Sequence, residues 1–186
     1  MKKLPIIALL LTATIAACNE DDEKSTWQEY ENWREQNNAW LEEMQARTNE
    51  DGTPYYTLVR PDWNPGAFVL MHYFNDPAEN ADKLSPIYTS TVDVRYELHL
   101  YDGTAVDSST TMTQYGPGIY RARLNNLVSG WAIGLPQMHC GDTVELIVPY
   151  GVGYGAQNTG TIKPYSNLRF NIRLVDIPYL EAPPYQ

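Results

Sequence analysis

Residues 127–141 read LVSGWAIGLPQMHCG, and this stretch decides the fold. The segment from Val128 to Leu135 predicts one short helix, set between strand-like segments at 118–123 and 142–148. No alternation of strands with long helices surrounds it, because the rest of this half of the chain consists of short strands and loops. Such a pattern is typical of an antiparallel α+β domain.

Alternating apolar residues predict the longest strand at 89–100, where Val92, Val94, Tyr96, Leu98 and Leu100 face one way. Further strands are expected at 55–60, 67–74 and 167–175, with a polar loop at 76–86. Each segment is short and ends near glycine, proline or polar residues, which favours a sheet built from tight connections.

An amphipathic helix is predicted upstream of these strands, beginning at residue 25 or 26 and ending near 47. Its stripe recurs at spacings of three and four and consists of Tyr30, Trp33, Asn37, Trp40 and Met44, widened by Trp27 and Leu41. Three tryptophans on one face require a partner surface. That partner is either the domain's own sheet or a second copy of the chain in a homodimer.

The first residues are typical of an export signal. Lys2 and Lys3 precede an apolar run of about ten residues, too short for a membrane span of about 20. The run ends in Thr14-Ile-Ala-Ala-Cys18, which resembles the bacterial lipobox, where the cysteine is lipidated. The alternative is an ordinary signal peptide with a cysteine by chance. Residues 18–24 then form an acidic tether.

The net charge of the chain disfavours anionic partners. Removing residues 1–17 leaves 11 of the 13 basic residues against 23 acidic ones, a formal charge of −12. A surface this acidic disfavours nucleic acid and anionic headgroups, so membrane attachment would come from a lipid on Cys18. Cys140 is then the remaining thiol, and its apolar neighbours favour a core position over a redox role.

Other chemistries lack support in the sequence. The glycines of 151–155 have no following helix or Lys-Ser/Thr pair, so they predict turns with positive φ rather than a phosphate loop. His72, His99 and His139 lack the spacing of metal ligands, and no metal or cofactor is expected. Nucleophile motifs of hydrolases are also missing from the sequence.

Three segments, in order and at matching spacing, resemble the FKBP family of peptidyl-prolyl isomerases. The first is 96–109, YELHLYDGTAVDSS, similar to the family's strand, Asp-Gly turn and Phe-Asp-Ser-Ser. The second is 127–141, with its Gly-Trp at the helix start. The third runs from Val148-Pro149 through Gly153-Tyr154-Gly155 to residues 162–170, IKPYSNLRF. The resemblance implies an antiparallel half-barrel wrapped on a short helix, and rotation of X–Pro bonds.

The same resemblance implies the roles of individual residues. Trp131 would form the pocket floor, Tyr96 and Phe170 the walls, and Tyr154 would offer a hydroxyl to a substrate carbonyl. Asp107 would lie beside the reacting amide. The implied substrate-binding residues are Val106, Tyr120, Leu127, Val128 and Ile162, with the Val128 N–H as a donor to the peptide. No cofactor is implied, because catalysis is preferential binding of the twisted amide.

The sequence also departs from the family. Val106 stands where the family has Phe, and a second family Phe has no clear counterpart, although Ile119 or Tyr120 could replace it. The tip that is usually Ile-Pro-Pro reads Ile162-Lys163-Pro164. Losing a ring predicts a wider, shallower pocket, and a missing transition-state contact of about 1.4 kcal/mol costs tenfold in rate.

The domain organisation expected from these patterns is a signal peptide at 1–17, a lipidated tether at 18–24, a helix and β extension at 25–86, an FKBP-like isomerase domain at 87–179 and a tail at 180–186. Three functions follow. The first is an isomerase for exported polypeptides on a bacterial outer membrane, facing the periplasm or the cell surface. The others are a chaperone-like or scaffolding module with little isomerase activity, and an assembly component that works through the aromatic helix.

Overall fold

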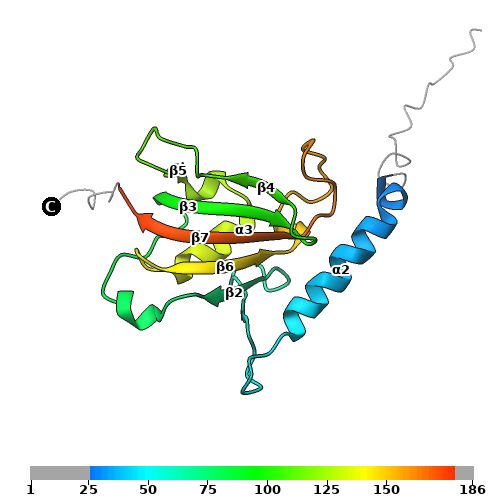
Figure 1. Cartoon of the computed structure of the whole chain (residues 1–186), viewed down its shortest axis with the longest axis horizontal. Helices are drawn as coiled ribbons and strands as arrows, with labels where there is room; N and C mark the ends of the chain where they lie inside the picture. The colour runs from blue at the N-terminus through cyan, green and yellow to red at the C-terminus, as the bar shows by residue number, and fades with distance from the viewer. Residues whose placement is uncertain (1–25, 179–186) are drawn as a thin grey trace, which may run out of the picture.

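The computed structural model describes residues 26–178 and contains one antiparallel sheet of seven strands (Figure 1). The strands are β1 (Thr57–Val59), β2 (Val69–Tyr73), β3 (Thr91–Leu100), β4 (Ala105–Ser108), β5 (Tyr120–Arg123), β6 (Thr143–Val148) and β7 (Leu168–Asp176). Their order is β1-β2-β6-β7-β3-β4, and β5 also pairs with β3. The predicted antiparallel α+β class is confirmed.

Strand β3 organises the sheet because it pairs with β7 on one side and with β4 and β5 on the other. All five residues that the alternation placed on one face are buried: Val92, Val94, Tyr96, Leu98 and Leu100. Asp93 is buried as well, on the opposite face, where its carboxylate accepts two hydrogen bonds from the Arg121 guanidinium at 2.6 and 2.7 Å. The pair neutralises a charge that would be costly to bury alone.

The predicted short helix is present as α3 (Ser129–Gly134), and it lies against one face of the sheet. Its glycines make this contact close. A Cβ on Gly130 would lie 2.4 Å from Cγ1 of Val148, and a Cβ on Gly134 would lie 2.7 Å from Cδ1 of Leu146. Any side chain at either position would therefore push α3 away from β6.

The amphipathic helix is also present, as a helical turn at 26–29 followed by α2 (Glu31–Ala46). Its C-terminal half packs on the other face of the sheet, where Met44 joins Tyr56, Leu70 and Ile147 in a second core cluster with Trp40 and Leu41 against it. The stripe therefore contacts its own domain, as the first alternative predicted. Self-association through this helix stays a prediction.

The N-terminal half of α2 is held to the loop before β7. Trp33 Nε1 donates to Ser166 Oγ at 3.0 Å. The fully buried Asn37 accepts two hydrogen bonds from Asn167, at its Oδ1 from the backbone N–H (2.8 Å) and at its backbone carbonyl from the side-chain amide (2.7 Å). A polar residue in the apolar stripe thus has a specific partner, which satisfies its buried amide.

Several expected boundaries shift. Strand β1 is shorter than the predicted 55–60, since Tyr55 and Tyr56 instead pack around His72. Strand β4 follows the Asp102-Gly103 turn, where Gly103 has φ 85°, and was not predicted as a strand. The remaining short 3-10 helices are η1 (Pro77–Asn80), η2 (Leu124–Asn126), η3 (Leu135–Gln137) and η4 (Tyr150–Val152).

The predicted signal peptide, the predicted lipidation site Cys18, the predicted tether and the predicted C-terminal tail lie outside the described residues. Between residues 26 and 178, every helix is too short or too polar to cross a membrane.

Replacing Gly130 by alanine should destabilise the domain. The new Cβ meets Val148 at 2.4 Å, and overpacking of this kind costs about 1–3 kcal/mol. The measurement is urea unfolding followed by circular dichroism. Gly151→Ala is the matched control, because a Cβ there has no neighbour within 4 Å. Equal unfolding free energies for the two variants would contradict the close packing of α3.

Candidate active site

A small pocket opens between β3, β4, β5, β7 and the start of α3, with a volume of about 130 Å³. The residues that line it are Tyr96, Leu98, Asp107, Tyr120, Leu127, Val128, Trp131, Tyr154 and Phe170. All of them except Leu98 were singled out from the sequence. The fold therefore brings together positions that are far apart in the chain.

An aromatic cluster forms the centre of the pocket. Trp131 is 3% exposed, and its ring meets the rings of Tyr96 and Phe170 edge-on, at centroid distances of 5.5 and 5.3 Å. Trp131 is held there because α3 is pressed on the sheet, whereas Tyr96 and Phe170 project from the paired strands β3 and β7. Edge-to-face rings are a favourable geometry, so the three side chains fix one another.

Tyr96 and Asp107 form the polar edge of this cluster. The Tyr96 hydroxyl donates to Oδ2 of Asp107 at 2.6 Å, and Oδ1 of Asp107 accepts from the Ser108 N–H at 2.8 Å. Burial, and then the hydrogen bond to Asp107, raise the pKa of Tyr96 above its ordinary value. The phenol therefore stays protonated at neutral pH and holds the carboxylate in place.

Tyr120 and Tyr154 complete the walls. The ring of Tyr120 packs edge-on against Tyr96 at 5.6 Å, so of the two candidates for the second missing Phe it is Tyr120 that lines the pocket. Tyr154 is half-buried, and its pKa is raised by burial and by the nearby charge of Asp107. It too is a neutral hydroxyl donor at physiological pH.

The loop that carries Tyr154 is shaped by its glycines in two ways. Gly155 has φ 61°, as the turn prediction required, and its N–H donates to the Tyr150 carbonyl at 2.9 Å. Gly153 has φ −100°, so there the prediction of positive φ was wrong. A Cβ on Gly153 would lie 3.3 Å from Leu168, and close approach is the reason for glycine at that position.

Val106 and Ile162 are not among the residues that line the pocket. Val106 is half-buried on β4 and packs against the main core, and Ile162 is 4% exposed within that core. Leu98 lines the pocket but was not singled out. Its position two residues after Tyr96 on β3 could have revealed it, since alternate residues of a strand share a face. The Val128 N–H as a donor to the peptide stays a prediction.

Within residues 26–178, no three His, Cys, Asp or Glu side chains gather as a metal site would require. The pocket contains one acidic side chain, Asp107, and is otherwise aromatic and aliphatic. Its own residues can therefore act through apolar contact and through the hydroxyls of three tyrosines.

This sheet, wrapped on a short helix with an aromatic pocket between them, defines the FKBP-like fold. Residues 84–175 match the model of the FKBP-type peptidyl-prolyl cis-trans isomerase family, so this part of the chain is a domain of that family.

Individual relatives agree. The macrophage infectivity potentiator of Trypanosoma cruzi is 34% identical over 105 residues, which cover 56% of this chain and 52% of that protein. The isomerase FkpA of Escherichia coli K12 is 32% identical over 103 residues, or 54% of this chain and 37% of that protein. A crystal structure of a peptidyl-prolyl cis-trans isomerase from Pseudomonas syringae has a TM-score of 0.62 at 24% identity, covering 79% of this chain and 94% of that one. The matched region thus spans about half or less of the curated relatives.

The raised pKa of Tyr96 predicts how the stability of the domain depends on pH. The unfolded chain ionises this tyrosine near pH 10, whereas the folded domain keeps its proton to higher pH. Its contribution to stability is therefore complete below pH 10 and is lost as the pH rises. Tyr96→Phe should reduce the loss by up to about 1.4 kcal/mol per pH unit.

Urea unfolding between pH 8 and pH 12 measures this slope. Tyr88→Phe is the control, because it removes an exposed hydroxyl. The same slope in both variants would show that Tyr96 does not titrate in this way.

Proposed function

We propose that this domain is a peptidyl-prolyl cis-trans isomerase that acts on X–Pro bonds of polypeptides. The observation that carries the proposal is the cluster in which Tyr96 and Phe170 meet Trp131 edge-on at the centre of a small pocket. An amide rotates slowly because resonance sets a barrier of about 18–20 kcal/mol. The twisted amide has lost that resonance and is less polar, so apolar aromatic walls favour it over the planar ground state.

Two polar side chains and one backbone N–H would orient the peptide in the pocket. Tyr154 can donate its hydroxyl to a carbonyl of the bound peptide. Asp107 is fixed by Tyr96 and Ser108 and presents its carboxylate at the pocket edge, beside the amide that rotates. We propose that the Val128 N–H, just before α3, donates to a second carbonyl of the peptide. No covalent step is needed.

The clients we propose are exported polypeptides. The supporting features are the apolar leader, the lipobox-like sequence ending in Cys18 and the acidic tether at 19–24. Together they favour a lipid-tethered protein of a bacterial outer membrane that faces the periplasm or the cell surface. A charge of −12 after removal of residues 1–17 means that the lipid, not the protein surface, supplies the membrane affinity.

A binding function with little isomerase activity is the second candidate. It is favoured by Val106, because the family's ring at this position is replaced by a half-buried aliphatic side chain outside the pocket lining. Peptide binding without acceleration of cis-trans exchange would support this candidate.

Tyr154→Phe tests the isomerase directly. Removing the hydroxyl should lower kcat/KM about tenfold in a protease-coupled assay with a proline tetrapeptide, because one transition-state hydrogen bond of about 1.4 kcal/mol is lost. Tyr165→Phe is the control, since Tyr165 is buried in the neighbouring loop and does not line the pocket. If the unchanged protein at micromolar concentration gives the buffer rate, the isomerase proposal is wrong.

Membrane attachment is tested by Cys18→Ser in a Gram-negative host. The unchanged protein should appear in the outer-membrane fraction with the mass of a lipidated chain, and the variant should not. Cys140→Ala is the matched control, because it removes the other thiol and leaves the tether intact. If neither variant leaves the outer-membrane fraction, or if both variants leave it, lipidation at Cys18 is contradicted.

A further inference from the structure

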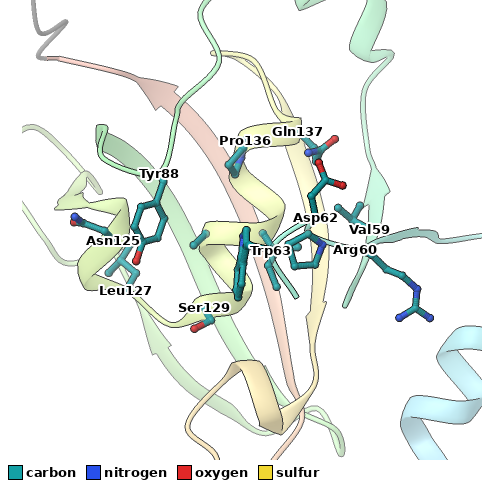
Figure 2. A pocket seen from close by; sticks show the side chains of 13 residues that line it. Val59, Arg60, Asp62, Trp63, Tyr88, Asn125, Leu127, Ser129, Pro136 and Gln137 are labelled. Atoms are coloured by element: carbon teal, nitrogen blue, oxygen red, sulfur yellow. The ribbon is translucent and has the colours of Figure 1, made fainter. Parts of the chain in front are cut away.

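A second and larger pocket, of about 830 Å³, lies on the outer side of α3. Figure 2 shows Trp63 in front of this helix and Tyr88 to its left, with Leu127 below Tyr88 and Pro136 above Trp63. We name this pocket the α3 groove. The segment before β2 that carries Trp63 forms one wall, and the segment before β3 that carries Tyr88 forms the other.

The outer face of α3 is unusual for a surface helix. One side of α3 is buried in the core through Gly130, Trp131, Ile133 and Gly134. The other side presents the half-buried Ala132 and, beyond the helix, Pro136 to the groove, with Ile133 at its floor. Ser129 is the polar residue on this side, and no charged side chain of α3 lies there. Helix faces exposed to solvent ordinarily include charged residues, so an uncharged face favours contact with a partner.

The residues that form the walls of the α3 groove leave its floor open to solvent. Trp63 is 65% exposed and Tyr88 is 58% exposed, so two large rings stand in solvent on either side of an apolar floor. Aromatic side chains held at a surface in this way mark binding sites more often than chance exposure. A volume of 830 Å³ also falls in the range of about 300–1,000 Å³ that is usual for ligand pockets.

The α3 groove adjoins the active site at Leu127. Leu127 lines both pockets, at the rim of the smaller one and at one end of the larger one. An extended chain advances about 3.3–3.6 Å per residue, so a polypeptide leaving the small pocket over Leu127 enters the groove within a few residues. This adjacency favours, as the occupant, part of the same chain that carries the X–Pro bond.

We propose that the α3 groove binds an extended apolar segment of the unfolded polypeptide whose proline occupies the small pocket. This inference rests on the proposed isomerase function and adds to it a second contact site, distant from the X–Pro bond, for the same polypeptide. Exposed Asn125, Ser129 and Gln137 at the edge offer hydrogen bonds to the backbone of such a segment.

The charged residues that line the α3 groove also restrict the charge of the segment that it can bind. Arg60 is engaged elsewhere, because its guanidinium donates to the Pro65 carbonyl at 3.1 Å and lies 5.5 Å from the Phe68 ring. Figure 2 shows its side chain directed away from Tyr88 and Leu127. Asp62 is the other charged side chain of the lining. Acidic segments are therefore disfavoured, and apolar or basic ones are accepted.

The experiment compares two substrates. A proline tetrapeptide reaches only the small pocket, whereas a reduced, alkylated protein whose refolding is limited by prolyl isomerisation also reaches the groove. Ala132→Glu places a charge on the groove floor, and Trp63→Ala removes one wall from a different segment. Phe74→Ala is the matched control, because Phe74 is an aromatic residue with 53% exposure outside the groove.

Both groove variants should keep the tetrapeptide kcat/KM within twofold and lower that for the refolding protein about tenfold, through KM. Fluorescence anisotropy with a labelled, permanently unfolded protein should show the same loss of affinity. Equal effects on both substrates, or no effect on either the refolding rate or the affinity, would overturn the groove proposal.

Two further outcomes separate this proposal from its alternatives. An unchanged protein that binds the unfolded chain through the groove but does not isomerise the tetrapeptide would refute the isomerase function alone. Tighter binding after removal of residues 179–186, which include Pro183 and Pro184, would show that the chain's own tail occupies the groove and would overturn the proposal.

Discussion

Gly130 and Gly134 bring α3 into direct contact with Val148 and Leu146 of β6, and the rest of the site depends on this contact. With any larger residue the helix would move outward and carry Trp131 away from Tyr96 and Phe170. The edge-to-face cluster, and hence the apolar pocket, exists because two positions one helical turn apart have no side chain. The same contact turns Ala132 and Pro136 outward, so it also sets the floor of the α3 groove.

The N-terminal helix is connected to this site by buried amides. Asn37 of α2 bonds Asn167, and the side-chain oxygen of Asn167 accepts from the Tyr150 N–H at 2.8 Å. Tyr150 begins the short helix η4, whose next turn leads to Tyr154. The Trp33 ring, in turn, lies 4.5 Å from the Lys163 ammonium, in the loop that follows. Because unsatisfied amides are costly to bury, α2 and these two loops are stabilised together. The extension is therefore part of the fold that positions the hydroxyl of Tyr154.

The sequence predicted the parts of the structure that follow a period or a motif. Alternation placed Tyr96 and Leu98 on the buried face of β3, and the resemblance to the FKBP family implied that Trp131 and Tyr154 share a pocket. It did not predict that Ile162 would be drawn into the core rather than the pocket lining, because burial of a loop residue depends on what packs over it. The α3 groove was also missed. Its walls come from residues near 63 and 88, which lie in irregular segments without periodicity, and only the fold brings them to either side of α3.

The two pockets divide the work of catalysis in a way that suits this departure from the family. The small pocket, at about 130 Å³, would contact the rotating bond, and Val106 provides no ring there. The α3 groove, at about 830 Å³, would contact residues that do not react. Binding energy from such remote residues can offset the entropy and orientation costs at the reacting bond, provided that the substrate is long enough to reach both sites. The lost wall contact lowers the rate by the same factor for short peptides and for unfolded chains. Only chains long enough to reach the groove would gain the additional binding energy. On this argument the absence of a ring at Val106 leaves long apolar polypeptides as the preferred substrates.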